Sequence, residues 1–124
     1  MNIMKHEELK VKLDRGDDVK LIMALDRRAY ENMHIPGSLH FANMLEAVNS
    51  LHPDDEVVVY CSNPACAASV NAYRILVSYG FRRVYRYAGG LAEWQEAGYP
   101  LEGLMVQPPE LRSDFAAPSL AMAA

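Results

Sequence analysis

Two cysteines stand close together in a segment whose pattern changes from apolar to helical. Residues 57–70 read VVVYCSNPACAASV, so Cys61 follows an apolar run directly and Cys66 lies in the short loop after it. A thiol reacts as the thiolate, whose pKa falls where positive potential surrounds it. If the loop curls back over Cys61, its backbone N–H groups and the start of the next helix supply that potential. The spacing therefore favours sulfur or phosphoryl chemistry at Cys61.

A packing role and a zinc site are the two simpler explanations for these cysteines. Free cysteine is among the most buried residue types, so Cys61 could be no more than a small buried hydrophobe. A structural zinc site needs four Cys or His ligands, usually arranged as two close pairs. The four histidines form no second pair of suitable spacing: His6, His34, His40 and His52. We therefore predict no metal site.

The segments around the cysteines alternate between strand and helix patterns. Uninterrupted apolar runs are typical of strands buried on both faces of a parallel sheet. Strands are expected at residues 21–25, 39–41, 57–60 and 84–87, and helices at 6–14, 27–33, 44–51, 68–79 and 91–97. This order predicts an α/β fold with a mostly parallel sheet of about five strands and helices on both faces. Sites in such sheets gather at the carboxyl ends of the strands, where Cys61 and Asp26 are expected.

Length and charge limit what the chain can be. The 124 residues are enough for one domain, which we place at residues 1–103, and the proline-rich pattern of residues 104–124 predicts a poorly ordered or loosely packed tail. The net charge of -4 argues against nucleic acid as a partner. No apolar run approaches the roughly 20 residues that span a membrane. Because acids stand near the N-terminus where a signal peptide would be apolar, a cytoplasmic location is expected.

Four stretches of the chain, in order, resemble the single-domain rhodaneses, a family of sulfurtransferases. Residues 25–28 (LDRR) are similar to the family's Asp-x-Arg segment, and residues 34–38 (HIPGS) match its His-Ile-Pro-Gly-Ala/Ser turn. Residues 57–61 (VVVYC) are similar to the strand that delivers the catalytic cysteine, and residues 87–101 resemble the closing Gly-Gly, Trp and Gly-x-Pro segment. The likeness covers about residues 6–103 and implies the rhodanese-like fold there.

The resemblance implies that Cys61 carries sulfur as a persulfide. Its thiolate would attack the outer sulfur of a donor such as thiosulfate and pass that sulfur to a thiophilic acceptor. Backbone N–H groups of the loop would hold the persulfide anion, so neither a metal nor another cofactor is expected. The expected partners are a small sulfur donor and a thiol or protein acceptor, with the chain a monomer or weak homodimer. The substrate-binding loop consists of Ser62, Asn63, Pro64, Ala65, Cys66 and Ala67.

The charge of this loop departs from the common family pattern. Common members often carry Arg or Lys in the loop, whereas Ala67 and Ala68 stand where an Arg is expected. We therefore expect weak binding of dianionic donors such as thiosulfate. The related phosphatases need an Arg six positions after the cysteine to grip phosphate, and Ala67 occupies that position here. Phosphatase activity is therefore not expected.

Cys66 and the segment around Asp26 leave alternatives open. A packing role is favoured for Cys66, although it could also resolve a persulfide or form a disulfide with Cys61. We expect two free thiols in the resting protein and a disulfide only under oxidant. Asp26 with Arg27 or Arg28 is a candidate site rim, for which a structural ion pair is favoured.

A non-catalytic module for binding or redox regulation is the alternative function. A permanently buried Cys61 or a collapsed loop would be its sign. His34 is expected to be structural and not a general base, and Trp94 is expected in the core.

Overall fold

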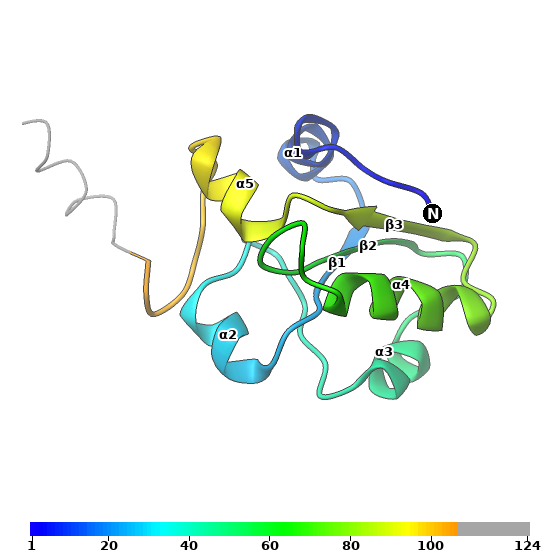
Figure 1. Cartoon of the computed structure of the whole chain (residues 1–124). Coiled ribbons are helices and arrows are strands. Elements are labelled where there is room, and N and C mark those ends of the chain that lie inside the picture. Colours follow the sequence, from blue (N-terminus) through cyan, green and yellow to red (C-terminus); the bar gives the residue numbers. More distant parts are fainter. Residues whose placement is uncertain (107–124) are drawn as a thin grey trace, which may run out of the picture.

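The computed structural model describes residues 1–106 and contains a parallel sheet of three strands in the order β1-β2-β3 (Figure 1). The strands are β1 (Val19–Met23), β2 (Glu56–Tyr60) and β3 (Arg83–Tyr87). The helices are α1 (His6–Arg15), α2 (Arg27–Asn32), α3 (Met44–Ser50), α4 (Ala68–Ser78) and α5 (Gly90–Glu96). The α/β class is confirmed, and each of these elements overlaps its predicted range, although β1 begins two residues before the range 21–25 expected for it.

The central strand β2 separates two hydrophobic cores, and all five of its residues are buried. Because successive side chains of a strand point to opposite faces, Val58 and Tyr60 pack with residues of α1 and α5, whereas Val57 and Val59 pack with residues of α3 and α4. Figure 1 shows these two helix pairs on opposite sides of the sheet. The continuous apolar run of β2 therefore reflects burial on both faces, as predicted.

The sheet is narrower than the five strands expected from the sequence. Each edge is extended by only a single bridge, in which Ile3 pairs with Arg86 and Leu39 pairs with Ile22. At the β1 edge, Leu39 N–H donates to Leu21 O (2.7 Å) and Leu39 O accepts from Met23 N–H (3.1 Å). The strand expected at 39–41 stops there because helix α3 begins only a few residues later, after Asn43 caps it.

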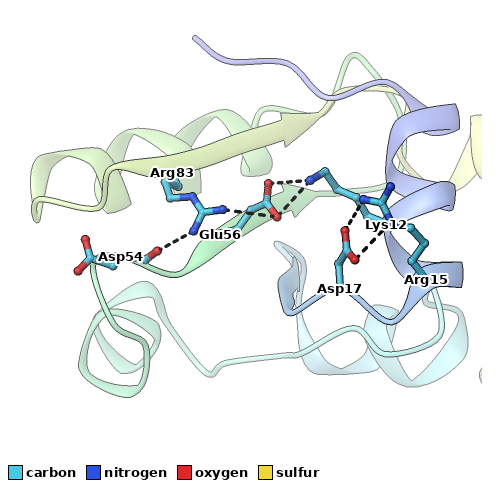
Figure 2. Close-up of polar contacts among 6 residues, drawn as sticks. All are labelled: Lys12, Arg15, Asp17, Asp54, Glu56 and Arg83. Atoms are coloured by element: carbon cyan, nitrogen blue, oxygen red, sulfur yellow. Dashed lines mark hydrogen bonds and ion pairs between the residues drawn. The ribbon is translucent and has the colours of Figure 1, made fainter.

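A buried carboxylate joins three elements at the amino-terminal end of the sheet (Figure 2). Glu56 begins β2 and is only 8% exposed. Lys12 of α1 lies 3.1 Å from Glu56 Oε2, and the Arg83 guanidinium of β3 lies 4.0 Å from Oε1. Arg83 also donates to the carbonyl of Asp54 (3.3 Å). A carboxylate removed from water needs such partners, so these contacts fix α1 against the sheet.

A second polar anchor fixes the turn at residues 34–38. The hydroxyl of Tyr60 accepts from the backbone N–H of Ile35 (3.0 Å) and lies 2.6 Å from Ser38 Oγ. All three residues are buried. The ring of His34 stacks on Tyr30 (4.2 Å between centroids), and its Nδ1 lies 2.7 Å from the Tyr30 carbonyl. His34 is therefore structural, as the sequence suggested.

The sequence predicts a poorly ordered or loosely packed tail at residues 104–124. Of these, residues 107–124 lie outside the part of the chain that the structure describes. Within the described part of the chain, no helix has the length and apolar composition that a membrane crossing requires.

Candidate functional site

Cys61 is the first residue after β2, so it lies at the carboxyl end of the central strand. The beginning of α5 holds its backbone in place. Leu91 N–H donates to the carbonyl of Cys61 (3.0 Å), and Ala92 N–H donates to the carbonyl of Ser62 (2.9 Å). Figure 1 shows the green loop between β2 and α4 beside the start of α5. Two backbone hydrogen bonds therefore fix the point at which the loop leaves the sheet.

Gly90 makes this close approach feasible. Its φ of +64° lies in the left-handed region, and a Cβ atom there would collide with the carbonyl oxygen of Cys61. The same Cβ would lie 2.9 Å from the carbonyl carbon of Ser62 and 3.0 Å from the nitrogen of Asn63. The glycine is therefore needed for both its conformation and its small size.

The loop folds back on itself so that Cys66 forms a disulfide with Cys61. The Asn63 side chain accepts from Ala65 N–H (2.9 Å), and the Asn63 carbonyl accepts from Cys66 N–H (3.1 Å). The two cysteine Cα atoms are 6.5 Å apart, within the range that a disulfide spans. The prediction of two free thiols and a packing role for Cys66 is therefore wrong for this structure. Local turn hydrogen bonds around Asn63 bring Cys66 back over Cys61.

The surroundings of Cys61 Sγ differ from the N–H cradle expected for an anion. Cys61 Sγ lies 3.6 Å from the carbonyl oxygen of Cys66 and 4.0 Å from that of Asn63. The N–H groups of Ala65 and Cys66 are already bonded to Asn63. Carbonyl oxygens repel a thiolate or persulfide anion, so this arrangement suits a neutral sulfur. The N–H groups of Ala65 and Cys66 are therefore directed to Asn63 and not to Cys61 Sγ.

Exposure differs between the two sulfur-bearing residues. Cys61 is 2% exposed, whereas Cys66 is half-buried. The loop residues Asn63, Pro64 and Ala65 are exposed. A molecule arriving from solvent therefore reaches Cys66 first, and the disulfide shields Cys61.

Arg86 brings a cation to the loop from a neighbouring strand. Its Nε donates to Ser69 Oγ (2.8 Å), and its Nη2 donates to the carbonyl of Pro64 (3.2 Å). Arg86 is opposite Val59 in the register of β2 with β3 and shares a sheet face with Val84, whose side chain lies in the core beneath α4. The guanidinium therefore ties β3 to both ends of the segment that carries Cys66.

An apolar pocket of about 250 Å³ lies on the other side of the start of α4. Its lining contains no charged side chain: Ile22, Met23, Ala24, Leu25, Phe41, Ala42, Asn43, Met44, Ala68, Asn71, Ala72 and Ile75. A dianion would find no charged partner there, so the pocket suits an apolar group near the loop.

The candidate rim around Asp26 is organised differently from the expectation. Asp26 caps α2, because its carboxylate accepts from Ala29 N–H (2.8 Å). Arg27 pairs with Glu31 (3.4 Å), one turn further along α2. Within residues 1–106 neither Arg27 nor Arg28 makes an ion pair with Asp26. The capped N–H of Ala29 is therefore a closer partner for Asp26 than either arginine. None of these three candidate rim residues lines the pocket beside α4.

Sequence reasoning missed Arg86 and the function of Gly90. Arg86 stands in a predicted strand two residues after the apolar Val84, and that alternation placed it on the α4 face. The signal that could have pointed to Arg86 is a charged residue on the buried face of a strand, near the carboxyl end of that strand. Gly90 belongs to the Gly-Gly pair that resembles the family's closing segment, but its contact with Cys61 joins segments far apart in the chain.

Comparison with known proteins agrees with this architecture. Residues 5–97 match the model of the rhodanese-like domain. The thiosulfate sulfurtransferase GlpE of Pseudomonas syringae is 34% identical over 90 residues, which cover 71% of this chain and 82% of that protein. An HTH-type transcriptional regulator, Rv0324, of Mycobacterium tuberculosis is 31% identical over 87 residues, which cover 68% of this chain but only 38% of the regulator.

A solved structure shares the fold over a similar extent. The rhodanese-like domain of the Alr3790 protein from Anabaena sp. superposes with a TM-score of 0.77 at 26% identity, covering 100% of this chain and 89% of that one. The family match spans three quarters of the sequence and includes the strand and loop that carry Cys61. The chain therefore belongs to the rhodanese-like domain family.

Proposed function

We propose that this domain is a rhodanese-type sulfurtransferase in which Cys61 carries the transferred sulfur. The observation that carries the proposal is the position of Cys61 at the carboxyl end of β2, at the base of a loop that leads into α4. Backbone hydrogen bonds from α5 hold the residue there. Similarity to thiosulfate sulfurtransferases over most of their length supports the same chemistry.

The reaction begins with the reduced loop. The Cys61 thiolate attacks the outer sulfur of thiosulfate, the sulfur–sulfur bond of thiosulfate breaks, and sulfite leaves with the electron pair. The enzyme then holds a persulfide, Cys61–S–S⁻. A thiophilic acceptor attacks the terminal sulfur, takes it, and leaves the Cys61 thiolate for the next cycle. No step requires a metal or an organic cofactor.

The charge of the site bears on the choice of donor. Residues 62–67 contain no cation, and the pocket beside α4 has no charged lining. Among residues 1–106, Arg86 is the cation bonded to the loop, and two of its N–H donors are already bonded to Pro64 and Ser69. A dianion such as thiosulfate is therefore bound weakly, and a persulfide donor of lower charge is the better substrate.

Intact-protein mass spectrometry of two cysteine variants tests the proposal. Reduced Cys66→Ser protein is incubated with thiosulfate, or separately with glutathione persulfide, and is then desalted. We expect it to gain one sulfur atom, which an acceptor thiol removes. Cys61→Ser protein, treated identically, should gain none. The assignment of Cys61 as the sulfur carrier would be contradicted if Cys61→Ser gained sulfur, or if neither variant gained any.

A redox-regulatory module is the second candidate function. The disulfide itself favours it, together with the near-complete burial of Cys61 in the closed loop. The similarity to a transcriptional regulator is compatible with such a role. In that case the disulfide should open and close reversibly in a thiol redox buffer, while Cys66→Ser protein takes up no sulfur from either donor.

A further inference from the structure

The disulfide joins the only two cysteines of the chain, and one of them is the proposed sulfur carrier. We propose that Cys66 resolves the persulfide on Cys61, so that the domain releases the sulfur as hydrosulfide and is left with the Cys61–Cys66 disulfide. A dithiol reductant then restores the two thiols. This inference rests on the proposed function and makes the domain a sulfide-releasing reductase of sulfane sulfur.

Release of hydrosulfide from the Cys61 persulfide needs only the Cys66 thiol as a reactant. The Cys66 thiol gives its proton to the terminal sulfur of the persulfide anion, and the resulting Cys66 thiolate attacks Cys61 Sγ, which is the inner sulfur of the persulfide. The bond between the two persulfide sulfurs breaks, and hydrosulfide leaves with the electron pair. A dithiol then supplies two electrons and two protons to the disulfide. With thiosulfate as donor, one thiosulfate and one dithiol give one sulfite, one hydrogen sulfide and one oxidised dithiol.

The loop is built to bring Cys66 to that sulfur. The hydrogen bonds from Ala65 N–H to the Asn63 side chain (2.9 Å) and from Cys66 N–H to the Asn63 carbonyl (3.1 Å) turn the chain back over Cys61. Arg86 holds the outside of the same turn through Pro64. An attacking group fixed inside the loop reacts as if at very high concentration, so it competes well with any acceptor from solution.

The polarity around Cys61 Sγ favours release over storage of the sulfur. The carbonyl oxygens of Cys66 and Asn63 lie 3.6 Å and 4.0 Å from it. Residues 62–67 contain no cation that could hold a persulfide anion. Closure of the loop exchanges that anion for a neutral disulfide and sends the negative charge into solvent with hydrosulfide.

The difference in exposure determines where the reductant enters. Cys66 is half-buried, whereas Cys61 is 2% exposed. A dithiol from solvent therefore attacks Cys66 Sγ, and the leaving group is the Cys61 thiolate. This direction regenerates the nucleophile in the first step of reduction. A packing role for Cys66 would require neither its partial exposure nor its position beside Cys61.

A single-turnover measurement under anaerobic conditions tests the inference. Fully reduced protein is mixed with thiosulfate or, separately, with glutathione persulfide, in the absence of a reductant. Hydrosulfide is trapped by alkylation, and the state of each cysteine is read by mass spectrometry. The unaltered protein should release about one hydrosulfide per chain and finish with the disulfide. Cys66→Ser should retain the sulfur on Cys61 and release hydrosulfide at least about tenfold more slowly.

Two further variants make the result decisive. Cys66→Ala repeats the test in case the serine disturbs folding, and Arg74→Gln changes an exposed residue of α4 while keeping both thiols, so it should behave as the unaltered protein. Retention of a stable persulfide by the unaltered protein beside a free Cys66 thiol would overturn the inference but leave the sulfurtransferase intact. Failure of both Cys66 variants to gain sulfur would overturn the proposed function and the inference together.

Discussion

Arg86 of β3 donates from Nε to Ser69 Oγ at 2.8 Å, which connects the sheet to the first turn of α4. Ser69 is 1% exposed, so this charge-assisted bond is largely screened from water on the acceptor side. The second bond of Arg86, to the carbonyl of Pro64, reaches the exposed tip of the loop. One side chain therefore sets the distance between the two ends of the Cys66 segment.

We predict that Arg86→Gln slows closure of the Cys61–Cys66 disulfide by about tenfold. The reason is the loss of a charge-assisted hydrogen bond, which contributes about 1.5–3 kcal/mol in such settings. The measurement is the rate of thiol loss after sulfur loading. The control is Arg74→Gln, since Arg74 is exposed on α4. Arg86→Lys, which keeps the charge, should restore part of the rate, and equal rates in all four proteins would exclude this positioning role.

Gly90→Ala should destabilise the domain more than Gly98→Ala. Both glycines have positive φ, +64° and +77°, so each substitution places alanine in the left-handed region at a cost of about 1–2 kcal/mol. Only at Gly90 does the new Cβ meet the backbone of Cys61 and Ser62, whereas nothing lies within 4 Å at Gly98. Overpacking adds about 1–3 kcal/mol.

Denaturant unfolding of the two glycine variants gives the difference. Sulfur loading should also fall in Gly90→Ala, because the strand end that carries Cys61 must shift. If Gly90→Ala and Gly98→Ala had the same free energy of unfolding, the contact of the added Cβ with the Cys61 backbone would not destabilise the domain.

Lys12→Met should lower the free energy of unfolding by about 1–3 kcal/mol. Among residues 1–106, the substitution leaves the 8% exposed Glu56 with the more distant guanidinium of Arg83 as its one ion-pair partner. Arg15→Met is the matched control on α1, since Arg15 pairs with Asp17 at the exposed surface (Figure 2) and its removal should change stability little. If the two variants lost the same free energy of unfolding in urea, the burial of Glu56 would not make its ion pair with Lys12 more important than the exposed pair.

Alkaline pH should destabilise the protein through Tyr60. Burial raises the pKa of Tyr60 from 10.0 to about 12. Above pH 10 the unfolded chain loses this proton while the folded protein keeps it, so stability is complete below pH 10 and falls as the pH rises toward 12. Each unit of difference corresponds to about 1.4 kcal/mol. Burial also raises the pKa of Tyr87, which adds to the same loss.

Tyr60→Phe isolates the contribution of Tyr60. The slope of unfolding free energy against pH should be shallower than in the unaltered protein, and stability at neutral pH should fall by about 1–3 kcal/mol because Ile35 N–H loses its acceptor. Tyr79→Phe, at an exposed position, should change neither quantity. An unchanged slope in Tyr60→Phe would refute the prediction.

Ala67→Arg should improve turnover with thiosulfate. Ala67 is exposed and directly precedes α4, so an arginine there can reach an anion at the loop. One added charge-assisted bond of about 1.5–3 kcal/mol corresponds to at least about a tenfold rise in kcat/KM, mainly through a lower KM. Ala67→Gln is the uncharged control. The unaltered protein should show no turnover of phosphate esters, and robust phosphatase activity would contradict our account of the loop charge.

Local pattern was sufficient for the helices and for the three strands that form the sheet of the described residues. The apolar run before Cys61 is buried on both faces of β2, and the helical spacing after Ala68 places Ala72 and Leu76 in the core. These features depend on residues close together in the chain, because backbone hydrogen bonding and side-chain alternation repeat over a few residues. The same local signals placed Cys61 at a strand end, where sites in parallel sheets form.

Contacts between distant segments decided the rest of the site. The sequence did not reveal that Arg86 bonds to Ser69 or that Gly90 meets the carbonyl of Cys61. It favoured two free thiols over a bond between Cys61 and Cys66, because chain length permits that bond without requiring it. Only the folded loop, turned by Asn63 and held by α5 and β3, brings the two sulfurs together, since no local period encodes how one segment packs against another.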